Sequence, residues 1–374
     1  MGIKGLNNIL KKYCLREGIL EISLANLEGK IIAIDTSIYI YKYTYNNNHL
    51  LENFLLQISA LLKNKITPLY VFDGKPSDEK KELIKKRKED SKKKEDKIIE
   101  LKNQIQLLQE KLEECSDEDE EQLLQFEISK LGMELNKKEK GLIIIDWELI
   151  TKFKKILKNL GIPYYECDGE SDIYIKYFFQ QNLIDYAITE DLDFLTHGCK
   201  NVLYDFNFKT NAIKQYNHEA ILNELNLSHN QFIDLCILMG CDYTTTIKNI
   251  GPKRAINLIK EYNNIEGIIE KIQNGDKKFK KFIIPETFDY KSARNMFKLE
   301  YQGQLNEYSR DKLNLKSLNL KEFYECINGI KISKSCISRI IKLRIPKIIK
   351  IKKTNRECKT ITQFLIKKPK STEN

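Results

Sequence analysis

The sequence predicts an α/β protein with a mostly parallel central sheet flanked by helices. Three short apolar runs carry this prediction, because each reads as a buried strand and each leads to an acidic residue. The runs are residues 31–34, 69–72 and 186–189, which lead to Asp35, Asp73 and Asp191. Helical patterns separate the runs, and strands that alternate with helices form parallel sheets.

The first helices and strands follow from local pattern. A short helix is expected over Leu6–Tyr13 and another over Leu50–Leu62, before the strands that end at Asp35 and Asp73. The composition then changes, because residues 77–140 contain no Pro, one Gly and many Lys and Glu.

Apolar residues recur at helical spacing in two stripes of this charged segment, which indicates two helices. The stripes are Ile98, Leu101, Ile105, Leu108 and Leu112, and then Leu124, Ile128, Leu131 and Leu135. Acidic residues 113–121 separate the stripes, so we expect an antiparallel helical hairpin with an acidic tip. A coiled-coil surface for a partner protein is the alternative.

The α/β pattern resumes near Leu142. A helix is expected over Trp147–Asn159, ending at Gly161, followed by residues 162–165 that lead to Glu170. Residues 228–272 are mainly helical in pattern, whereas residues 273–330 are mixed and receive no assignment. We therefore divide the chain into five parts: residues 1–76 and 142–240 as the two halves of the core, 77–141 as the inserted hairpin, 241–330 as a helical region and 331–374 as a basic tail.

Charge is distributed unevenly along the 374 residues. The net charge is +10, but residues 331–374 carry 14 Lys and Arg against two acids, so the first 330 residues sum to −2. A basic tail on a near-neutral body suggests a polyanionic partner, with a solvated tail as the alternative.

Composition excludes several classes of protein. The nine Cys form no Cys-x-x-Cys pair and only four His are present, which argues against a zinc site or a disulfide framework and favours a reducing compartment. No apolar run approaches about 18 residues, so we expect a soluble protein without a membrane partner. We also find no obvious Ser-His or Cys-His nucleophile.

Acidic residues stand where strands and helices are expected to begin or end. They are Asp35, Asp73, Glu170, Asp172, Asp191, Asp193 and Asp242. Taken singly, each reads as a turn residue or a helix cap. Taken together, they point to one crevice, because ligands bind outside the carboxyl ends of parallel strands. So many negative charges need cations, and hard divalent ions with oxygen ligands are the natural choice.

An ordered set of short motifs carries a family resemblance. The motifs are Met1–Leu6, Ile34–Ser37, Val71–Pro76, Gly169–Asp172, Thr189–Asp193, Gly240–Tyr243 and Ile250–Ala255. In this order they resemble the structure-specific 5′ nuclease family, in its flap endonuclease branch, over residues 1–262 apart from the hairpin. The resemblance implies a PIN-like nuclease core with an inserted helical arch and a helix-two-turn-helix element that binds DNA.

The resemblance also implies two-metal hydrolysis of DNA phosphodiesters. All seven acids would hold two Mg²⁺ ions directly or through water, with Mn²⁺ as a substitute. The family has Glu-Ala-Glu where this chain has Glu170-Ser171-Asp172, so the second acid is shorter here. We expect Asp35, Asp73, Glu170, Asp172 and Asp191 to lie nearest the ions.

Two cations match the family's arch by their spacing from Asp73. Lys80 and Arg87 would lie on one side of a helix and face the scissile phosphate, where positive charge stabilises the reaction. The alternative is a solvated face, because residues 80–94 are crowded with Lys and Arg.

Two further residues match positions at the family's cleavage site. Tyr41 matches an aromatic that stacks on a base, with Tyr39, Tyr43 and Tyr45 as rivals whose default role is core packing. Gly2 matches the residue that becomes the processed amino terminus near the metals.

Residues 247–254 read as helix, tight turn and helix, with Gly251 supplying the turn and Pro252 at the first helical position. Amides at such a helix start can grip a phosphate. The resemblance makes this element the duplex holder, with Gly251, Lys253 and Arg254 contacting phosphates and a K⁺ ion on the turn carbonyls. Asn249 stands where the family commonly has Gly. An unrelated helix-turn-helix is the alternative.

The tail offers two further matches. Residues 358–365 resemble a sliding-clamp-binding box in which Ile361, Phe364 and Leu365 form the apolar plug, although Cys358 stands where Gln is expected. The lysine-rich residues 347–353 suit a nuclear-import signal or a strip that contacts DNA.

These features predict a Mg²⁺-dependent 5′ flap endonuclease with 5′–3′ exonuclease activity, acting as a monomer on branched DNA in replication and repair. We expect it in the nucleus of a eukaryote or in a viral replication compartment in the host cytoplasm. A sister 5′ exonuclease, a bubble or junction nuclease, and a non-catalytic DNA scaffold are the alternatives. The seven acids argue against the scaffold, because their repulsion destabilises a fold that binds no metal.

Overall fold

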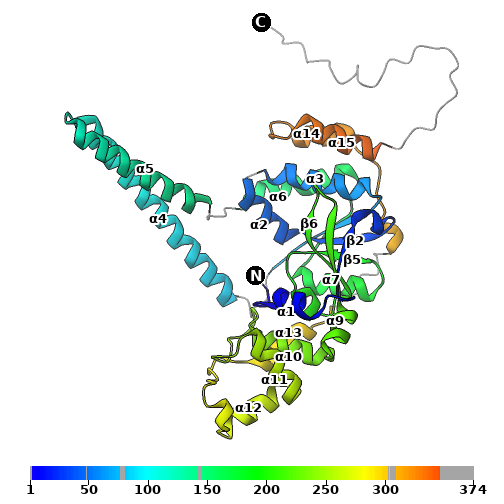
Figure 1. The fold of residues 1–374 in the computed structure, drawn as a ribbon. Coiled ribbons are helices and arrows are strands. Elements are labelled where there is room, and N and C mark those ends of the chain that lie inside the picture. The colour runs from blue at the N-terminus through cyan, green and yellow to red at the C-terminus, as the bar shows by residue number, and fades with distance from the viewer. Residues whose placement is uncertain are drawn as a thin grey trace, which may run out of the picture.

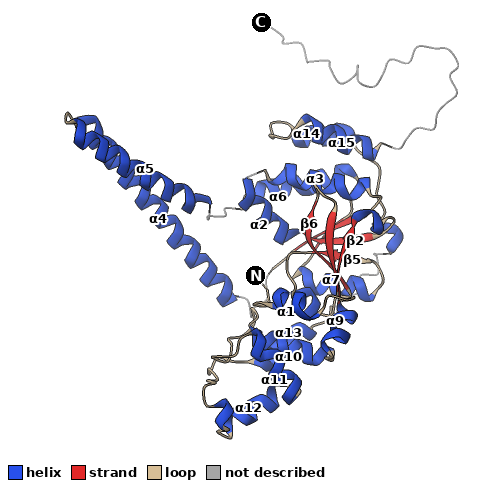
Figure 2. Cartoon of the chain, viewed as in Figure 1, coloured by secondary structure: helices blue, strands red, loops and turns tan. Residues whose placement is uncertain are grey.

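The computed structural model describes residues 2–47, 49–75, 81–140, 145–301, 303 and 309–345. Within these ranges the chain forms a seven-stranded sheet with helices on both faces, and a helical hairpin projects from this core (Figure 1). Figure 2 shows the strands enclosed between helical layers. The expected α/β class is confirmed. No helix in the described ranges is long and apolar enough to cross a membrane.

Most of the sheet is parallel. Its strand order is β1-β7-β6-β5-β2-β3-β4, in which β6, β5, β2, β3 and β4 run parallel while β7 and β1 add antiparallel pairs at one edge. The strands are β1 (Ile19–Ser23), β2 (Ile31–Asp35), β3 (Thr67–Phe72), β4 (Tyr164–Glu166), β5 (Tyr186–Ile188), β6 (Asn201–Asn207) and β7 (Ala212–Asn217). Every residue of β2 is buried, because both neighbouring strands and both helical layers cover it.

Alternate side chains of β2 enter two different cores. Ile31 and Ala33 pack with one helical layer, whereas Ile32 and Ile34 pack with the other. The first layer contains α1 (Leu6–Tyr13), α7 (Ser171–Gln180), α9 (His218–Leu225), α10 (His229–Met239), α11 (Pro252–Tyr262), α12 (Ile265–Gln273) and α13 (Tyr290–Lys298). The second contains α2 (Thr36–Asn47), α3 (Leu50–Lys63), α6 (Trp147–Leu160), α14 (Leu320–Ile327) and α15 (Lys334–Arg344).

The remaining elements are short and lie in the connections between the longer helices and strands. They are the four-residue helix α8 (Asp193–Thr196) and the 3₁₀ turns η1 (Leu24–Leu27), η3 (Lys277–Phe279) and η4 (Arg310–Leu313).

The predicted hairpin is formed by α4 (Lys81–Glu114) and α5 (Glu118–Lys140). Both apolar stripes are partly buried between the helices, and Ile98 and Leu101 are fully buried. At about 1.5 Å per residue, the 34 residues of α4 extend about 50 Å. The connections at residues 76–80 and 141–144 lie outside the described ranges.

The acidic tip of the hairpin is shorter than predicted, because helices occupy most of residues 113–121. Asp117 starts α5 as its cap: its Oδ1 accepts hydrogen bonds from the amides of Asp119 and Glu120 at 2.9 and 3.0 Å. The first turn of α5 carries four acids, and negative charge there is favoured by the helix dipole. The acids therefore stabilise a helix start.

The segment between α10 and α11 corrects the prediction of a helix before Gly251. Helix α10 ends at Met239, and Gly240 has a φ of +111° that cannot continue a helix. Residues 240–251 form a loop tied to a neighbouring segment, where the amide of Lys248 donates to the Ile283 carbonyl at 2.9 Å.

The turn residue before α11 is Asn249 and not Gly251. Asn249 has a φ of +68°, which Asn tolerates, and its Nδ2 donates to the Lys281 carbonyl at 2.7 Å. Gly251 has a φ of −107° that any residue adopts, and Pro252 follows at the start of α11 as predicted.

Helix α13 lies in the segment that the sequence pattern left unassigned. Arg294 on this helix pairs with the buried Asp234 of α10 at 2.8 Å and with Glu266 of α12 at 2.8 Å. These bonds join three helices on the same side of the sheet.

Candidate active site

One cavity of about 270 Å³ gathers all seven predicted acids. Three strand ends, the start of α7 and the loop after α10 contribute to its lining. The lining residues are Asp35, Ser37, Ile38, Tyr41, Asp73, Gly74, Arg87, Glu170, Ser171, Asp172, Asp191, Asp193 and Asp242. The cavity lies at the carboxyl edge of the parallel strands, as expected for an α/β sheet.

The adjacent ends of β2 and β5 hold three of the acids. Asp35 is 6% exposed, and its Oδ2 accepts a hydrogen bond from the Thr189 hydroxyl at 2.9 Å. The same hydroxyl accepts from the amide of Asp191 at 3.0 Å, and Asp191 Oδ1 accepts from the amide of Asp193 at 3.0 Å. Thr189 therefore fixes the turn that presents both Asp191 and Asp193.

The end of β3 is tied to the loop before α7. Gly74 donates its amide to the Gly169 carbonyl at 2.7 Å, and a Cβ on Gly74 would lie 2.1 Å from the Cys167 carbonyl oxygen. This close approach brings Asp73 to α7, where Asp73 Oδ1 accepts from the Ser171 amide at 2.8 Å. Glu170 and Asp172, which flank Ser171, thereby reach the cavity.

The predicted arch cation Arg87 also reaches the cavity. Its Nη2 lies 3.0 Å from Oδ2 of Asp242 and forms an ion pair that joins α4 to the loop after α10. The Arg87 side chain remains 45% exposed, so it is accessible to a ligand. Lys80, its predicted partner, lies outside the described residues.

The amino-terminal segment packs against the acids. The amide of Ile3 donates to Asp193 Oδ1 at 2.9 Å, and the amide of Lys4 donates to the Gly240 carbonyl at 3.1 Å. A Cβ on Gly2 would lie 2.2 Å from Asp191 Oδ1, so the site leaves no room for a side chain there.

The four tyrosine side chains of α2 differ in their exposure to solvent. Tyr39 and Tyr43 are buried at 0% and 4% exposure and pack in the core. Tyr41 is 40% exposed and lines the cavity, whereas Tyr45 is exposed but is not part of the lining. Tyr41 is therefore the α2 tyrosine that can meet a ligand among the carboxylates.

Burial and mutual repulsion disfavour the charged form of two acids. Burial raises the pKa of Asp35 well above the usual value for Asp, and the charges of Asp73 and Asp172 raise it further. Burial also raises the pKa of Asp193, with the neighbouring Asp191 adding to the effect. Cations among the carboxylates would relieve this repulsion.

The donor set fits hard divalent cations. All seven acidic ligands offer oxygen, which suits Mg²⁺, and the cavity lining contains no Cys or His that would favour a softer metal. As placed, no three Asp, Glu, His or Cys side chains within the described ranges form a closed metal cage.

The predicted DNA-contact residues at the start of α11 are not part of the cavity lining. Lys253 and Arg254 are exposed in the first turn, and Arg254 Nη1 donates to the Asn249 carbonyl at 2.6 Å. No heavy atom comes within 4 Å of a Cβ built on Gly251, so the helix start is open. The predicted clamp-binding residues Ile361, Phe364 and Leu365 lie outside the described residues.

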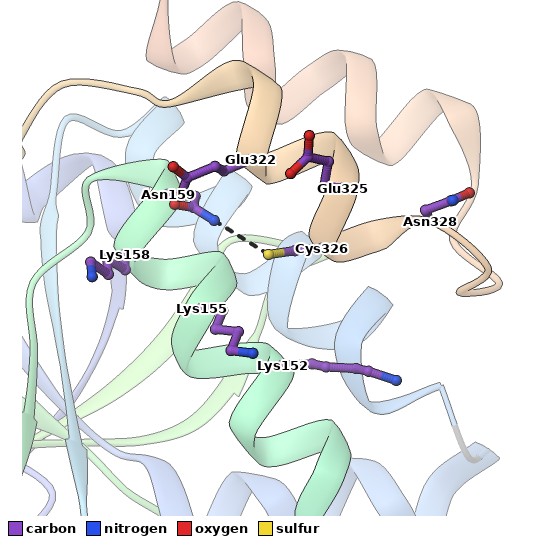
Figure 3. Close-up of a pocket in the computed structure, with 8 residues that line it drawn as sticks. All are labelled: Lys152, Lys155, Lys158, Asn159, Glu322, Glu325, Cys326 and Asn328. Atoms are coloured by element: carbon purple, nitrogen blue, oxygen red, sulfur yellow. Dashed lines mark hydrogen bonds between the residues drawn. The ribbon is translucent and has the colours of Figure 1, made fainter. Parts of the chain in front are cut away.

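A second cavity, of about 540 Å³, lies between α6 and α14 (Figure 3). Lys152, Lys155 and Lys158 line one side, with Glu322 and Glu325 on the other. This cavity includes none of the predicted site residues, so it is separate from the carboxylate site.

Sequence reasoning missed the groups that support the acids. Thr189 stands inside one of the recognised motifs, so a hydroxyl two residues before Asp191 was an available signal. Tyr243, whose hydroxyl donates to Glu170 Oε2 at 3.4 Å, directly follows Asp242. The hydrogen bond from the Ile3 amide has no signature in the sequence, because every residue except proline has a backbone N–H.

Family models match two segments of the chain. The XPG N-terminal domain matches residues 1–94, and the XPG I-region matches residues 161–242. These segments supply all seven acids of the cavity.

Relatives named flap endonuclease 1 match most of the chain. Flap endonuclease 1 of Aedes aegypti is 31% identical over 319 residues, which are 80% of this chain and 75% of the relative. Flap endonuclease 1 of Nematostella vectensis is 32% identical over 316 residues, with the same shares of each chain.

Solved structures share the fold. The catalytic core of Rad2 in complex with a DNA substrate has a TM-score of 0.65 at 20% identity and covers 92% of this chain and 99% of its own. Flap endonuclease-1 from Methanococcus jannaschii has a TM-score of 0.56 at 21% identity, covering 87% and 95%. GEN1 in complex with product DNA and a Mg²⁺ ion has a TM-score of 0.56 at 15% identity, covering 86% and 72%.

Proposed function

The chain belongs to the flap endonuclease family of XPG nucleases, and from this membership we infer that it is a structure-specific nuclease that cleaves 5′-flap DNA. The observation that carries the inference is the gathering of seven carboxylates in one cavity at the strand ends. A 5′–3′ exonuclease activity on the same site, in replication and repair, is part of the proposal.

We propose that the seven carboxylates hold two Mg²⁺ ions, with Mn²⁺ as a substitute. Bound ions would activate water and stabilise the negative charge that develops on the phosphodiester. The buried Asp35 and Asp193 favour this role, because their charged forms need compensation.

The neighbouring residues would position the DNA. Tyr41 is exposed beside the carboxylates and can stack on a base without reading its identity. Arg87 bonds Asp242 through an exposed ion pair, so a phosphate could compete for the same guanidinium. Lys80 is proposed to share this task with Arg87. Gly2 has no side chain, so the backbone there can lie close to the carboxylates of Asp191 and Asp193.

The hairpin offers a basic route for the 5′ single strand. Five lysines and one glutamate line a cleft of about 680 Å³ between α4 and α5; they are Lys93, Lys94, Lys97, Glu134, Lys137 and Lys138. Lysines there attract a phosphate backbone regardless of sequence. We therefore propose that the flap passes along this half of the hairpin, away from the acidic tip.

The duplex would be held at the start of α11. Gly251 leaves the helix start open, and Lys253 and Arg254 are exposed there, so amides and cations can meet a phosphate. The K⁺ ion proposed for the turn would share the Asn249 carbonyl with Arg254.

The remaining proposals concern partners and location. We propose a monomer that acts on branched DNA and binds a sliding clamp through Ile361, Phe364 and Leu365. Relatives named flap endonuclease 1 occur in animals and in the protist Entamoeba histolytica, which favours the nucleus over a viral replication compartment in the host cytoplasm.

A cleavage panel tests the activity. With Mg²⁺ present, the chain should cut a 5′-flap duplex faster than nicked, blunt, bubble or four-way substrates of identical sequence. Asp191→Asn should reduce flap cleavage by at least about 100-fold while flap binding, measured by fluorescence anisotropy, stays near the parent value.

Two outcomes would contradict the proposal. Preference for the bubble or four-way substrate would assign the chain a sister activity. Equal cleavage by Asp191→Asn and the parent would remove that acid from the reaction.

A further inference from the structure

Two carboxylates of the cavity, Glu170 and Asp172, are each contacted by an aromatic side chain. The Tyr243 hydroxyl donates to Oε2 of Glu170 at 3.4 Å. His197 is 1% exposed, and its Nε2 lies 3.9 Å from Oδ2 of Asp172. Glu170 and Asp172 both belong to the start of α7. Tyr243 and His197 therefore contact the same short stretch of chain at two points.

The rings of Tyr243 and His197 both pack against the ring of Phe297. Phe297 of α13 is fully buried, and its ring centroid lies 5.1 Å from that of Tyr243 and 5.2 Å from that of His197. The interplanar angles are 84° and 63°, so both contacts are edge-to-face, an arrangement that aromatic pairs favour.

Ion pairs attach α13, the helix that carries Phe297, to its neighbours. Arg294, three residues before Phe297, pairs with the buried Asp234 and with Glu266. The amide of His197 also donates to the Asp193 carbonyl at 2.9 Å, so the His197 backbone is attached to a third acidic residue of the cavity.

We propose that Tyr243, Phe297 and His197 form an aromatic clasp that positions the Glu170 and Asp172 carboxylates for divalent cations. This inference rests on the proposed function. The Tyr243 hydroxyl bonds one oxygen of Glu170, which restricts the rotamer and leaves the other oxygen available to an ion, as second-layer partners do in metal sites. His197 Nε2 lies 3.9 Å from Asp172, beyond direct hydrogen-bond distance, so His197 acts on this carboxylate by contact and by the polarity of its buried ring. It is a positioning residue because it does not line the carboxylate cavity.

Mg²⁺ binding is the direct test. It is measured on the full chain by calorimetry, alongside the Mg²⁺ concentration that gives half-maximal flap cleavage. His197→Phe keeps an aromatic ring against Phe297 but removes the polar ring nitrogen beside Asp172, and it should weaken Mg²⁺ binding by about 10-fold. The Mg²⁺ requirement for cleavage should shift by a similar factor.

Conservative variants separate positioning from packing. His197→Gln keeps an N–H near the Nε2 position and should restore most of the affinity. Tyr243→Phe removes the 3.4 Å hydrogen bond to Glu170 and should also weaken Mg²⁺ binding. Tyr216→Phe is the matched control: it removes a buried tyrosine hydroxyl that donates to Asn7 at 2.7 Å and does not line the carboxylate cavity. It should leave Mg²⁺ affinity unchanged.

The outcomes distinguish this inference from the proposed function. A parent that cuts flaps, together with His197→Phe and Tyr243→Phe variants of parental Mg²⁺ affinity, would overturn the clasp alone. An equal loss of affinity in Tyr216→Phe would also overturn it, because general destabilisation would then explain the effect. A parent that neither binds Mg²⁺ nor cuts would overturn the proposed function and the clasp with it.

Discussion

Gly2 illustrates at the residue scale how tightly the amino-terminal segment fits the carboxylates. Its φ is +87°, and an added Cβ would lie 2.2 Å from Asp191 Oδ1. We expect Gly2→Ala to displace Asp191 and slow flap cleavage by about 100-fold, because small misplacements of reacting groups are costly. Single-turnover kinetics would measure this loss.

Gly29 provides the matched control. It also has a positive φ, +77°, but no heavy atom lies within 4 Å of its added Cβ. Gly29→Ala should therefore show only the backbone cost of about 1–2 kcal/mol in stability, with parental cleavage. Similar cleavage losses in both variants would show that backbone strain, and not crowding at Asp191, is responsible.

The buried acids predict a pH effect on stability. The pKa values of Asp35 and Asp193 are raised in the folded chain, mainly by burial. Their stabilising contribution is therefore complete at low pH, where both are protonated, and is lost as the pH rises through the raised pKa values. Cations should offset this loss by favouring the ionised carboxylates.

Thermal unfolding with EDTA or Mg²⁺ between about pH 5 and pH 8 checks this expectation. The Mg²⁺-induced rise in Tm should grow with pH, and Asp193→Asn should reduce that growth. A rise that is independent of pH would contradict the role assigned to these carboxylates.

Single residues were predictable where the fold has a general rule. Asp35, Asp73 and Asp191 follow apolar runs, and strand ends of a parallel sheet meet at one edge, so their convergence followed from sequence. His197 and Tyr243 could not be paired with the acids in this way. Their common contact is Phe297, which is far away in the chain and belongs to a segment without a clear pattern.

At the scale of elements, the loop after β3 depends on a glycine. A Cβ on Gly74 would lie 2.1 Å from the Cys167 carbonyl oxygen, which is backbone and cannot rotate away. Gly74→Ala should separate this loop from residues 168–169 and lower the free energy of unfolding by about 1–3 kcal/mol. Flap cleavage should fall as well, because Asp73 would lose its bond to the Ser171 amide.

Gly169→Ala is the comparison for stability. Its added Cβ meets no heavy atom within 4 Å, so chemical denaturation should give a free energy of unfolding within about 0.5 kcal/mol of the parent. Equal destabilisation by the two variants would show that the close approach at Gly74 is not what holds the loops together.

Element prediction succeeded where a pattern was local. The helix Leu6–Tyr13 has the predicted bounds, and α3 and α6 each end within one residue of the prediction. The strands β1, β6 and β7 were not predicted. Strand β1 lies at the sheet edge and is mostly exposed, so pairing with β7 and not an apolar run defines it. The loop after Met239 was misread as helix because its bonds to residues 283–287 are long-range.

At the scale of the whole molecule, Arg294 joins three helices on the side of the sheet that carries α11. Asp234 is 2% exposed, and burial raises its pKa even with Arg294 beside it. Arg294→Ala would leave this buried carboxylate without its cation and should lower the free energy of unfolding by about 3–5 kcal/mol. Denaturant titration would measure the change.

Lys278 is the matched exposed cation. It pairs with Glu261 at 2.9 Å, but both side chains are in solvent, so Lys278→Ala should leave stability almost unchanged. If Arg294→Ala and Lys278→Ala changed the free energy of unfolding equally little, the ion pairs of Arg294 would not be what joins α10, α12 and α13.

The position of Gly2 has a practical consequence for recombinant work. Any polypeptide fused ahead of this residue would start beside Asp191 and Asp193, which line the cavity. The last described helix, α15, instead packs on α3, across the sheet from α1 (Figure 1). A purification tag left at the front of the chain would therefore hinder substrate entry.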